Sequence, residues 1–259
     1  MVLNQIHVRA DSDALERDAE RLVAAYERRK SRVPQCRYSF LNVGNLLNVQ
    51  ECERAILAGL RRHGVDLARA QICEIGCGAG YWLREFVRFG FQPENIVGID
   101  LLPDRIAEAR RLCPAETSLS TGNAAATGLE AEAFDVVAQF TVFSSVRDTG
   151  IRRRIADEMM RLCRPNGVIL WYDFFVDNPR NRDVVGIRRH EIESLFAPYR
   201  VHLRRLTLAP PLARMLGKRS AALVRCVAAL KIFSTHYLGV IEKNAATVVP
   251  IRRRAQDQS

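Results

Sequence analysis

A glycine-rich segment that directly follows a short apolar run constrains this chain more than any other feature. Ala70-Gln-Ile-Cys73 leads into Glu74-Ile-Gly-Cys-Gly-Ala-Gly80, and apolar residues at helical spacing follow. Glycines allow a tight turn and a close approach of the backbone to a ligand, and the N-terminus of the following helix presents free N–H groups. The spacing GxGxG also differs from the GxGxxG of dinucleotide-binding folds, which argues against an NAD-linked oxidoreductase. The segment therefore predicts an α/β fold with a ligand at its first strand-to-helix turn.

Two acidic residues stand at the ends of the first two predicted strands. Glu74 precedes the first glycine, where an acid can accept a hydrogen bond from a ligand ammonium or orient the loop. Asp100 follows Asn95-Ile-Val-Gly-Ile99, and an acid at this position suits hydrogen bonds to both hydroxyls of a ribose. Alternatively, the glycines are ordinary turn residues and Asp100 caps the next helix. The combination of glycines and acid, each after a strand, favours a nucleotide site.

Apolar segments alternate with helical segments through most of the chain, which is typical of a mostly parallel sheet with helices on both faces. The predicted strands are 70–75, 95–99, 117–120, 134–140, 167–174, 200–207 and 235–242. The predicted helices between them lie near 80–89, 103–112, 148–163, 188–197 and 210–231. Two earlier helices, 12–31 and 49–63, flank a loop at 35–48. We therefore expect an N-terminal helical cap (1–65), an α/β core (66–243) and a polar tail (244–259).

The balance of charge bears on three classes of partner. The 39 Lys and Arg residues exceed the 29 Asp and Glu residues, which gives a formal net charge of +10. Such a surplus can favour nucleic acid, anionic lipid or acidic substrates. The basic residues form small dispersed clusters without an aromatic-interleaved stripe, which favours solvated helix faces over nucleic acid. Residues 210–231 combine apolar helical spacing with basic residues, so this segment either packs on the core or contacts an anionic membrane peripherally.

Cysteine and histidine usage predicts a reduced, cytoplasmic protein without a metal site. The seven cysteines form no CxxC pair, and the five histidines lack zinc-type spacing. We find no basic segment followed by an apolar run at the N-terminus and no apolar stretch of about 18 residues, so neither a signal peptide nor a spanning helix is predicted.

Residues 70–175 resemble the class I S-adenosylmethionine (SAM)-dependent methyltransferase family. The resemblance rests on CEIGCGAG at 73–80, VGIDLLPDRI at 97–106, the segment around Gly122-Asn-Ala124, Phe134–Phe143 and Leu162–Trp171. It implies a seven-stranded Rossmann-like sheet of order 3-2-1-4-5-7-6 with strand seven antiparallel. It also implies SAM as cofactor and S-adenosylhomocysteine as product, with an N-terminal cap that closes over the cofactor. The cofactor-binding residues expected are Glu74, Gly76, Cys77, Gly78, Gly80, Asp100, Leu101, Asn123, Ala124 and Gln139. The family usually has an acid where Asn123 stands.

Methyl transfer to a hydroxyl requires alignment of the reacting atoms and removal of a proton. Asp173, at the carboxyl end of the fifth strand, is the candidate general base, and His190, His202 and His236 are alternatives. Candidate acceptor-binding residues are Tyr38, Phe40, Tyr172, Asn178 and Arg180. Asp173 could instead cap a loop, and the segment after it could be a plain turn.

The leading hypothesis is methyl transfer to a hydroxyl, less favourably an amine, of a small molecule or a glycan intermediate. A loose resemblance to bacterial methyltransferases of glycan and secondary-metabolite pathways supports it. Methylation of RNA is an alternative that would require a contiguous basic groove. A third reading is a SAM-binding partner subunit without catalysis, which would expose an apolar patch.

Overall fold

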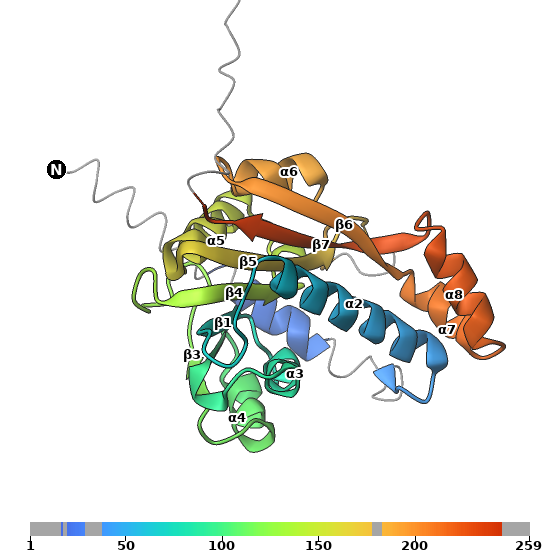
Figure 1. Cartoon of the computed structure of the whole chain (residues 1–259), viewed down its shortest axis with the longest axis horizontal. Coiled ribbons are helices and arrows are strands. Elements are labelled where there is room, and N and C mark those ends of the chain that lie inside the picture. Colours follow the sequence, from blue (N-terminus) through green and yellow to red (C-terminus); the bar gives the residue numbers. More distant parts are fainter. Residues whose placement is uncertain (1–16, 18–19, 29–37, 178–182, 245–259) are drawn as a thin grey trace, which may run out of the picture.

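The computed structural model describes residues 17, 20–28, 38–177 and 183–244. Its centre is one seven-stranded sheet of order β3-β2-β1-β4-β5-β7-β6 (Figure 1). The strands are β1 (Ile72–Ile75), β2 (Ile96–Asp100), β3 (Ser118–Thr121), β4 (Phe134–Phe140), β5 (Cys163–Phe174), β6 (Arg200–Leu208) and β7 (Ser234–Glu242). β7 runs antiparallel to β5 and β6, and the other neighbouring pairs are parallel. The fold expected from the sequence, including the strand order, is confirmed.

Helices cover both faces of the sheet because alternate side chains of its central strands are apolar on both sides. One core cluster joins β1, β4 and β5 to α2 (Val43–Arg62), α3 (Tyr81–Phe89) and α4 (Pro103–Leu112). The other joins the same strands to α5 (Thr149–Leu162) and α6 (Arg189–Leu195). Residues 20–28 are also helical, and short 3₁₀ turns occur at η2 (Pro93–Asn95) and η3 (Phe143–Ser145).

Helix α2 begins earlier than the sequence pattern suggested. Residues 43–48 are helical rather than part of a loop, because the side chain of Asn42 accepts a hydrogen bond from the Gly44 N–H at 3.0 Å and starts the helix there. The buried side of α2 includes Cys52, Ile56 and Leu60, which belong to the core of the sheet.

The single helix expected at 210–231 is two helices, α7 (Pro210–Gly217) and α8 (Ala221–Ala229). Ser220 starts α8 by accepting a hydrogen bond from the Leu223 N–H at 3.4 Å. Both helices lie between β6 and β7 in the chain and project beyond the sheet beside the N-terminal end of α2 (Figure 1). Among the described residues, none of the helices has the length and apolar character that a membrane crossing requires.

Candidate functional site

The glycine-rich segment forms the turn between β1 and α3. Gly76, Gly78 and Gly80 have φ values of +69°, +55° and +73°, a region that disfavours residues with a Cβ. Gly80 directly precedes α3 without a side-chain cap, so backbone N–H groups at this helix N-terminus are available to a ligand. A Cβ on Gly78 would meet no atom within 4 Å, so the space above this residue is open. Cys77 is buried beneath the turn.

Asp100 at the end of β2 holds this turn in place. Its Oδ2 accepts a hydrogen bond from the Gly78 N–H at 2.8 Å, and its Oδ1 accepts one from the Leu102 N–H at 2.9 Å. Burial raises the pKa of the Asp100 carboxyl from its ordinary value, and the two backbone hydrogen bonds oppose that rise. Each oxygen keeps a further lone pair, so the carboxylate can accept two more hydrogen bonds from a ligand.

A cavity that is partly open to solvent lies above the turn, and the empty space in it, with the part open to solvent included, is about 740 Å³. Gly76, Asp100 and Leu101 line it from the ends of the first two strands, and Asn123 and Ala124 line it from the segment after β3. The opposite wall is mostly apolar and comes from β4, η3 and α5 through Phe140, Thr141, Val142, Ser145, Val146, Ile151 and Ile155.

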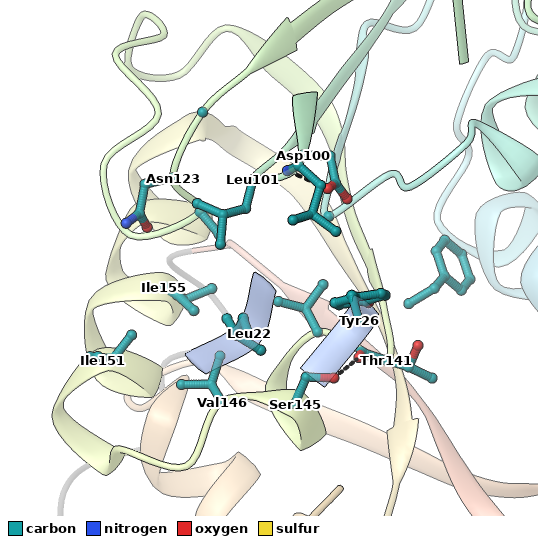
Figure 2. A pocket seen from close by; sticks show the side chains of 16 residues that line it. Leu22, Tyr26, Asp100, Leu101, Asn123, Thr141, Ser145, Val146, Ile151 and Ile155 are labelled. Carbon is teal, nitrogen blue, oxygen red and sulfur yellow. Dashed lines mark hydrogen bonds between the residues drawn. The ribbon is translucent and has the colours of Figure 1, made fainter. Parts of the chain in front are cut away.

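The helix at 20–28 covers part of this cavity. Leu22 and Tyr26, one turn apart, both line it (Figure 2). Arg21 donates a hydrogen bond to the Ser145 carbonyl at 2.5 Å, and the guanidinium of Arg105 on α4 lies 5.9 Å from the Tyr26 ring centroid. The helix is therefore attached to both sides of the cavity that it covers.

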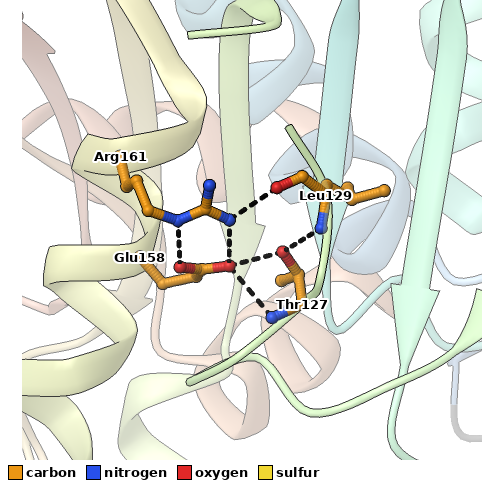
Figure 3. A network of polar contacts seen from close by, with 4 residues as sticks. All are labelled: Thr127, Leu129, Glu158 and Arg161. Atoms are coloured by element: carbon orange, nitrogen blue, oxygen red, sulfur yellow. Dashed lines mark hydrogen bonds and ion pairs between the residues drawn. The ribbon is translucent and has the colours of Figure 1, made fainter. Parts of the chain in front are cut away.

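A network of polar contacts fixes the segment that follows Asn123 and Ala124. Glu158 on α5 accepts hydrogen bonds from the Thr127 N–H at 2.9 Å and from the Thr127 hydroxyl, and it pairs with Arg161 Nε at 2.7 Å (Figure 3). Arg161 also donates to the Leu129 carbonyl at 2.7 Å. Hydrogen bonds from Arg161 and Thr127 lower the pKa of Glu158 to about 2. The segment beside the cavity is thus tied to α5.

Two buried polar atoms next to the site have no hydrogen-bond partner among the described residues: Oε2 of Glu74 and Nε2 of Gln139. Burial and the neighbouring Asp100 raise the pKa of Glu74 well above its ordinary value. The Oε1 of Gln139 accepts a hydrogen bond from the Val142 N–H at 3.0 Å and so orders the turn after β4. Gln139 pairs across β1 and β4 with Ile75, the residue between Glu74 and Gly76. Glu74 and Gln139 therefore both lie close to the glycine turn. Neither Glu74 nor Gln139 lines the cavity itself.

Asp173 lies away from the cavity. It is completely buried, and its carboxylate accepts hydrogen bonds from the Ser144 N–H at 3.1 Å and the Phe174 N–H at 2.8 Å. Burial raises its pKa to about 6, although those hydrogen bonds favour the charged form. Since Ser144 belongs to η3 and Ser145 and Val146 line the cavity, this geometry suits a residue that positions η3 rather than one that touches an acceptor.

The candidate acceptor residues do not meet in one place. Tyr172 is directed into the core near α2, where its hydroxyl contacts Thr207 at 2.6 Å and its ring stacks on His236 at 4.7 Å. Tyr38 and Phe40 are exposed and do not line the cavity. Asn178 and Arg180 lie outside the described residues. Of the three candidate histidines, none lines the cavity: His236 is buried, and His190 and His202 are exposed.

The sequence pattern did not single out Leu22, Tyr26, Ser145, Ile151 and Ile155, which the fold brings to the cavity. Leu22 with Tyr26 and Ile151 with Ile155 are apolar pairs at a spacing of four, which is equally typical of helices that pack on a core. Thr141, at the end of β4, also lines the cavity, and its φ of +60° is unusual for a β-branched residue. Strain of this kind is often found in ligand-binding turns.

Comparisons with known proteins agree with this geometry. A family profile described as "Methyltransferase domain" matches residues 72–167. No curated protein sequence matches the chain significantly. The crystal structure of a putative sarcosine dimethylglycine methyltransferase from Galdieria sulphuraria is similar with a TM-score of 0.57 and 17% identity, over 74% of this chain and 85% of that one.

Two further solved structures share the fold. Magnesium protoporphyrin IX methyltransferase from Synechocystis PCC 6803, solved with bound SAM, gives a TM-score of 0.53 at 13% identity, over 75% of this chain and 80% of that one. The cyclase SpnF gives a TM-score of 0.56 at 13% identity, over 75% and 82%. At these identities the structural likeness concerns the fold, which hosts more than one kind of activity.

Proposed function

Because the chain contains a methyltransferase domain and has the fold of class I SAM-dependent methyltransferases, we propose that it binds SAM in the cavity beside Asp100 and transfers the methyl group to an acceptor. The observation that carries this proposal is the Asp100 carboxylate, which is fixed by the Gly78 and Leu102 N–H groups and still lines the cavity. An acid held in this way at the end of β2 suits a ribose with two hydroxyls.

The residues around the cavity fit such a nucleotide. The backbone of Gly76 and Gly78 and the N-terminus of α3 would hold the polar methionine portion. Asp100 would accept from the ribose hydroxyls, and Leu101, Asn123 and Ala124 would surround the adenine. Asn123 uses its Oδ1 to accept from the Ala125 N–H at 2.9 Å, so its amide NH₂ would serve a ring nitrogen. Gln139 acts from beneath by ordering the turn after β4.

When bound, SAM supplies a sulfonium methyl group that a nucleophile attacks by an SN2 displacement. The role of this chain is to align the acceptor and to exclude water, for which the apolar wall of Val142, Val146 and Ile155 and the covering Leu22 and Tyr26 are suited. We propose a small molecule or a glycan intermediate as acceptor, with a hydroxyl as the attacking group.

An amine acceptor is the second candidate, and one observation favours it. Among the described residues that line the cavity there is no His, Glu or Lys, and Asp100 would serve the glycine turn and the ribose. A neutral amine attacks before it loses its proton, whereas an ordinary alcohol benefits from a base as it attacks. The hydroxyls of Tyr26, Thr141 and Ser145 would then orient the acceptor rather than deprotonate it.

Calorimetric titration of the full chain with S-adenosylhomocysteine, with NAD as a control ligand, tests the cofactor assignment. We expect micromolar binding of S-adenosylhomocysteine and none of NAD. Asp100→Ala should weaken binding by about 100-fold, because two hydrogen bonds to a charged group are lost. Asp104→Ala, which changes an exposed acid on α4 four residues away, should leave binding unchanged. Equal affinity of both variants, each with an unchanged melting temperature, would refute the site.

Formation of S-adenosylhomocysteine from SAM with panels of sugars, phenols and amines tests the acceptor. Turnover with sugars or phenols supports a hydroxyl acceptor, and turnover with amines alone replaces it by the second candidate. Binding of SAM without turnover on any panel, including structured RNA, would favour a partner subunit without catalysis.

A further inference from the structure

The exposed apolar side chains of this protein are concentrated at one end of the fold. Ten large apolar residues are exposed among the described residues, and eight of them lie in two segments: Tyr38, Phe40, Leu41, Met215, Leu223, Leu230, Ile232 and Phe233. Leu41 is the extreme case, with 96% of its surface exposed. Solvated apolar side chains gathered in this way are typical of a surface that meets an apolar partner.

The two segments adjoin each other. Asn42 donates a side-chain hydrogen bond to the Arg214 carbonyl of α7 at 3.1 Å. A Cβ on Gly44 would lie 2.0 Å from the Ala213 carbonyl oxygen, so the first turn of α2 packs directly on α7. Residues 38–41 and 210–233 therefore form one surface, which we call the apolar tip. Residues 210–233 follow β6 in the chain. The carboxyl end of β6 lies at the same sheet edge as the carboxyl ends of β4 and β5 (Figure 1).

The charge of the apolar tip is entirely positive. Residues 194–241 contain no Asp or Glu, and the side chains of Lys218, Arg219 and Arg225 are exposed on or between α7 and α8. No carboxylate among the described residues forms an ion pair with these three. Lys231, in contrast, pairs with Glu51 and contributes no free charge. The exposed tip thus combines aliphatic side chains with uncompensated cations.

From this combination we propose that the apolar tip docks the protein on the surface of an anionic lipid bilayer. Short amphipathic helices with basic and aliphatic residues lie in the plane of such a surface, with the apolar side chains at the level of the headgroups. A second copy of the chain would oppose cations to cations without an acid between them. Single-stranded RNA is held mainly by stacking on aromatic rings, whereas five of the eight exposed apolar side chains of the tip are not aromatic. The docking does not depend on methyl transfer.

Co-sedimentation of the full chain with vesicles tests the proposal. Vesicles of phosphatidylcholine alone are compared with vesicles that contain about one third phosphatidylglycerol, at low and high salt. We expect sedimentation with the anionic vesicles, weakened by salt. Lys218→Gln with Arg219→Gln should weaken partitioning about 25-fold, from roughly fivefold for each cation. Leu41→Ser with Met215→Ser should weaken it by about tenfold, even at low salt.

The matched control is Arg111→Gln with Leu112→Ser, a basic and a half-exposed apolar residue at the end of α4, far from the tip (Figure 1). This variant should sediment like the wild type, and all variants should keep their affinity for S-adenosylhomocysteine. The proposal is overturned if anionic vesicles fail to sediment the protein. It is equally overturned if the control variant loses as much vesicle binding as the tip variants do. It is also overturned if the tip variants change only the binding of RNA or of an acidic protein, or only self-association measured by light scattering.

Discussion

The contacts of Glu158 allow a quantitative prediction, because this carboxylate anchors the segment beside the cavity to α5. Its pKa falls from an ordinary 4.5 to about 2, mainly through the hydrogen bond from Arg161 and then through those from Thr127. This shift corresponds to about 3 kcal/mol of stability at neutral pH. The side chain of Arg161 is 40% exposed, so solvent screening reduces the contribution to about 1.5–2 kcal/mol.

Glu158→Gln removes this contribution, since a glutamine amide turns an N–H group toward donors that need an acceptor. We expect a melting temperature about 4–6 °C lower at pH 7, measured by circular dichroism. Affinity for S-adenosylhomocysteine should fall several-fold, because the segment that carries Asn123 loses its attachment. A folded pKa below the unfolded one stabilises the protein above about pH 4.5, and this stability is lost as the pH falls toward about 2. The difference between variant and wild type should therefore shrink over that interval.

Glu108→Gln is the matched control. Glu108 also pairs with an arginine three residues away, at 3.4 Å from Arg105, but both side chains are more than 40% exposed. Such a pair contributes about 0.5 kcal/mol or less. Equal losses of stability in the two variants would refute the reasoning, since burial and the Thr127 contacts would then add nothing.

Two further predictions concern backbone space and pH. Gly76→Ala should destabilise the protein by about 1–3 kcal/mol in urea and weaken nucleotide binding, because its Cβ would lie 2.4 Å from Val142 at a φ of +69°. Gly64 has a φ of +65°, but an added Cβ would meet no atom within 4 Å, so Gly64→Ala introduces backbone strain without a clash. It should lower the free energy of unfolding by less than Gly76→Ala does. Burial lowers the pKa of His236 to about 3. The folded protein therefore loses stability as the pH falls from about 6.5 toward 3, because only the unfolded chain binds the proton in that interval. We expect His236→Phe to remove about 2 kcal/mol of the stability loss that the wild type shows between pH 7 and pH 5.

The features that local sequence pattern specifies are those that the structure reproduces. A strand, three glycines and a helix determine the turn at 76–80 within a few residues, and Asp100 ends the neighbouring parallel strand at the same sheet edge. Strand order depended on the family resemblance, because alternating segments alone do not state which strands are neighbours. The early start of α2 was missed because the cap of Asn42 competed with a loop-like composition in the preceding residues.

The acceptor side of the site depends on contacts between distant segments, which one sequence does not reveal. Leu22 and Tyr26 reach the cavity from the N-terminal helix, and an apolar pair of this kind looks the same when it packs on a core. Asp173 was placed correctly at the end of β5, yet alternation along a strand sends neighbouring side chains to opposite faces. The pattern could not tell that its carboxylate would lie beneath Ser144 instead of in the cavity.

The cavity has a polar end and an apolar end, which different residues form. The polar end at Asp100 and Asn123 is preorganised by hydrogen bonds to Gly78, Leu102 and Ala125, so nucleotide binding requires little rearrangement there. The other end is apolar and is covered by a helix from elsewhere in the chain. A displacement at a sulfonium spreads positive charge toward the acceptor, and a site that excludes water without adding a cation can accommodate that change. Under the proposed function, alignment of the acceptor and exclusion of water are therefore the contributions that the described lining of the cavity supports.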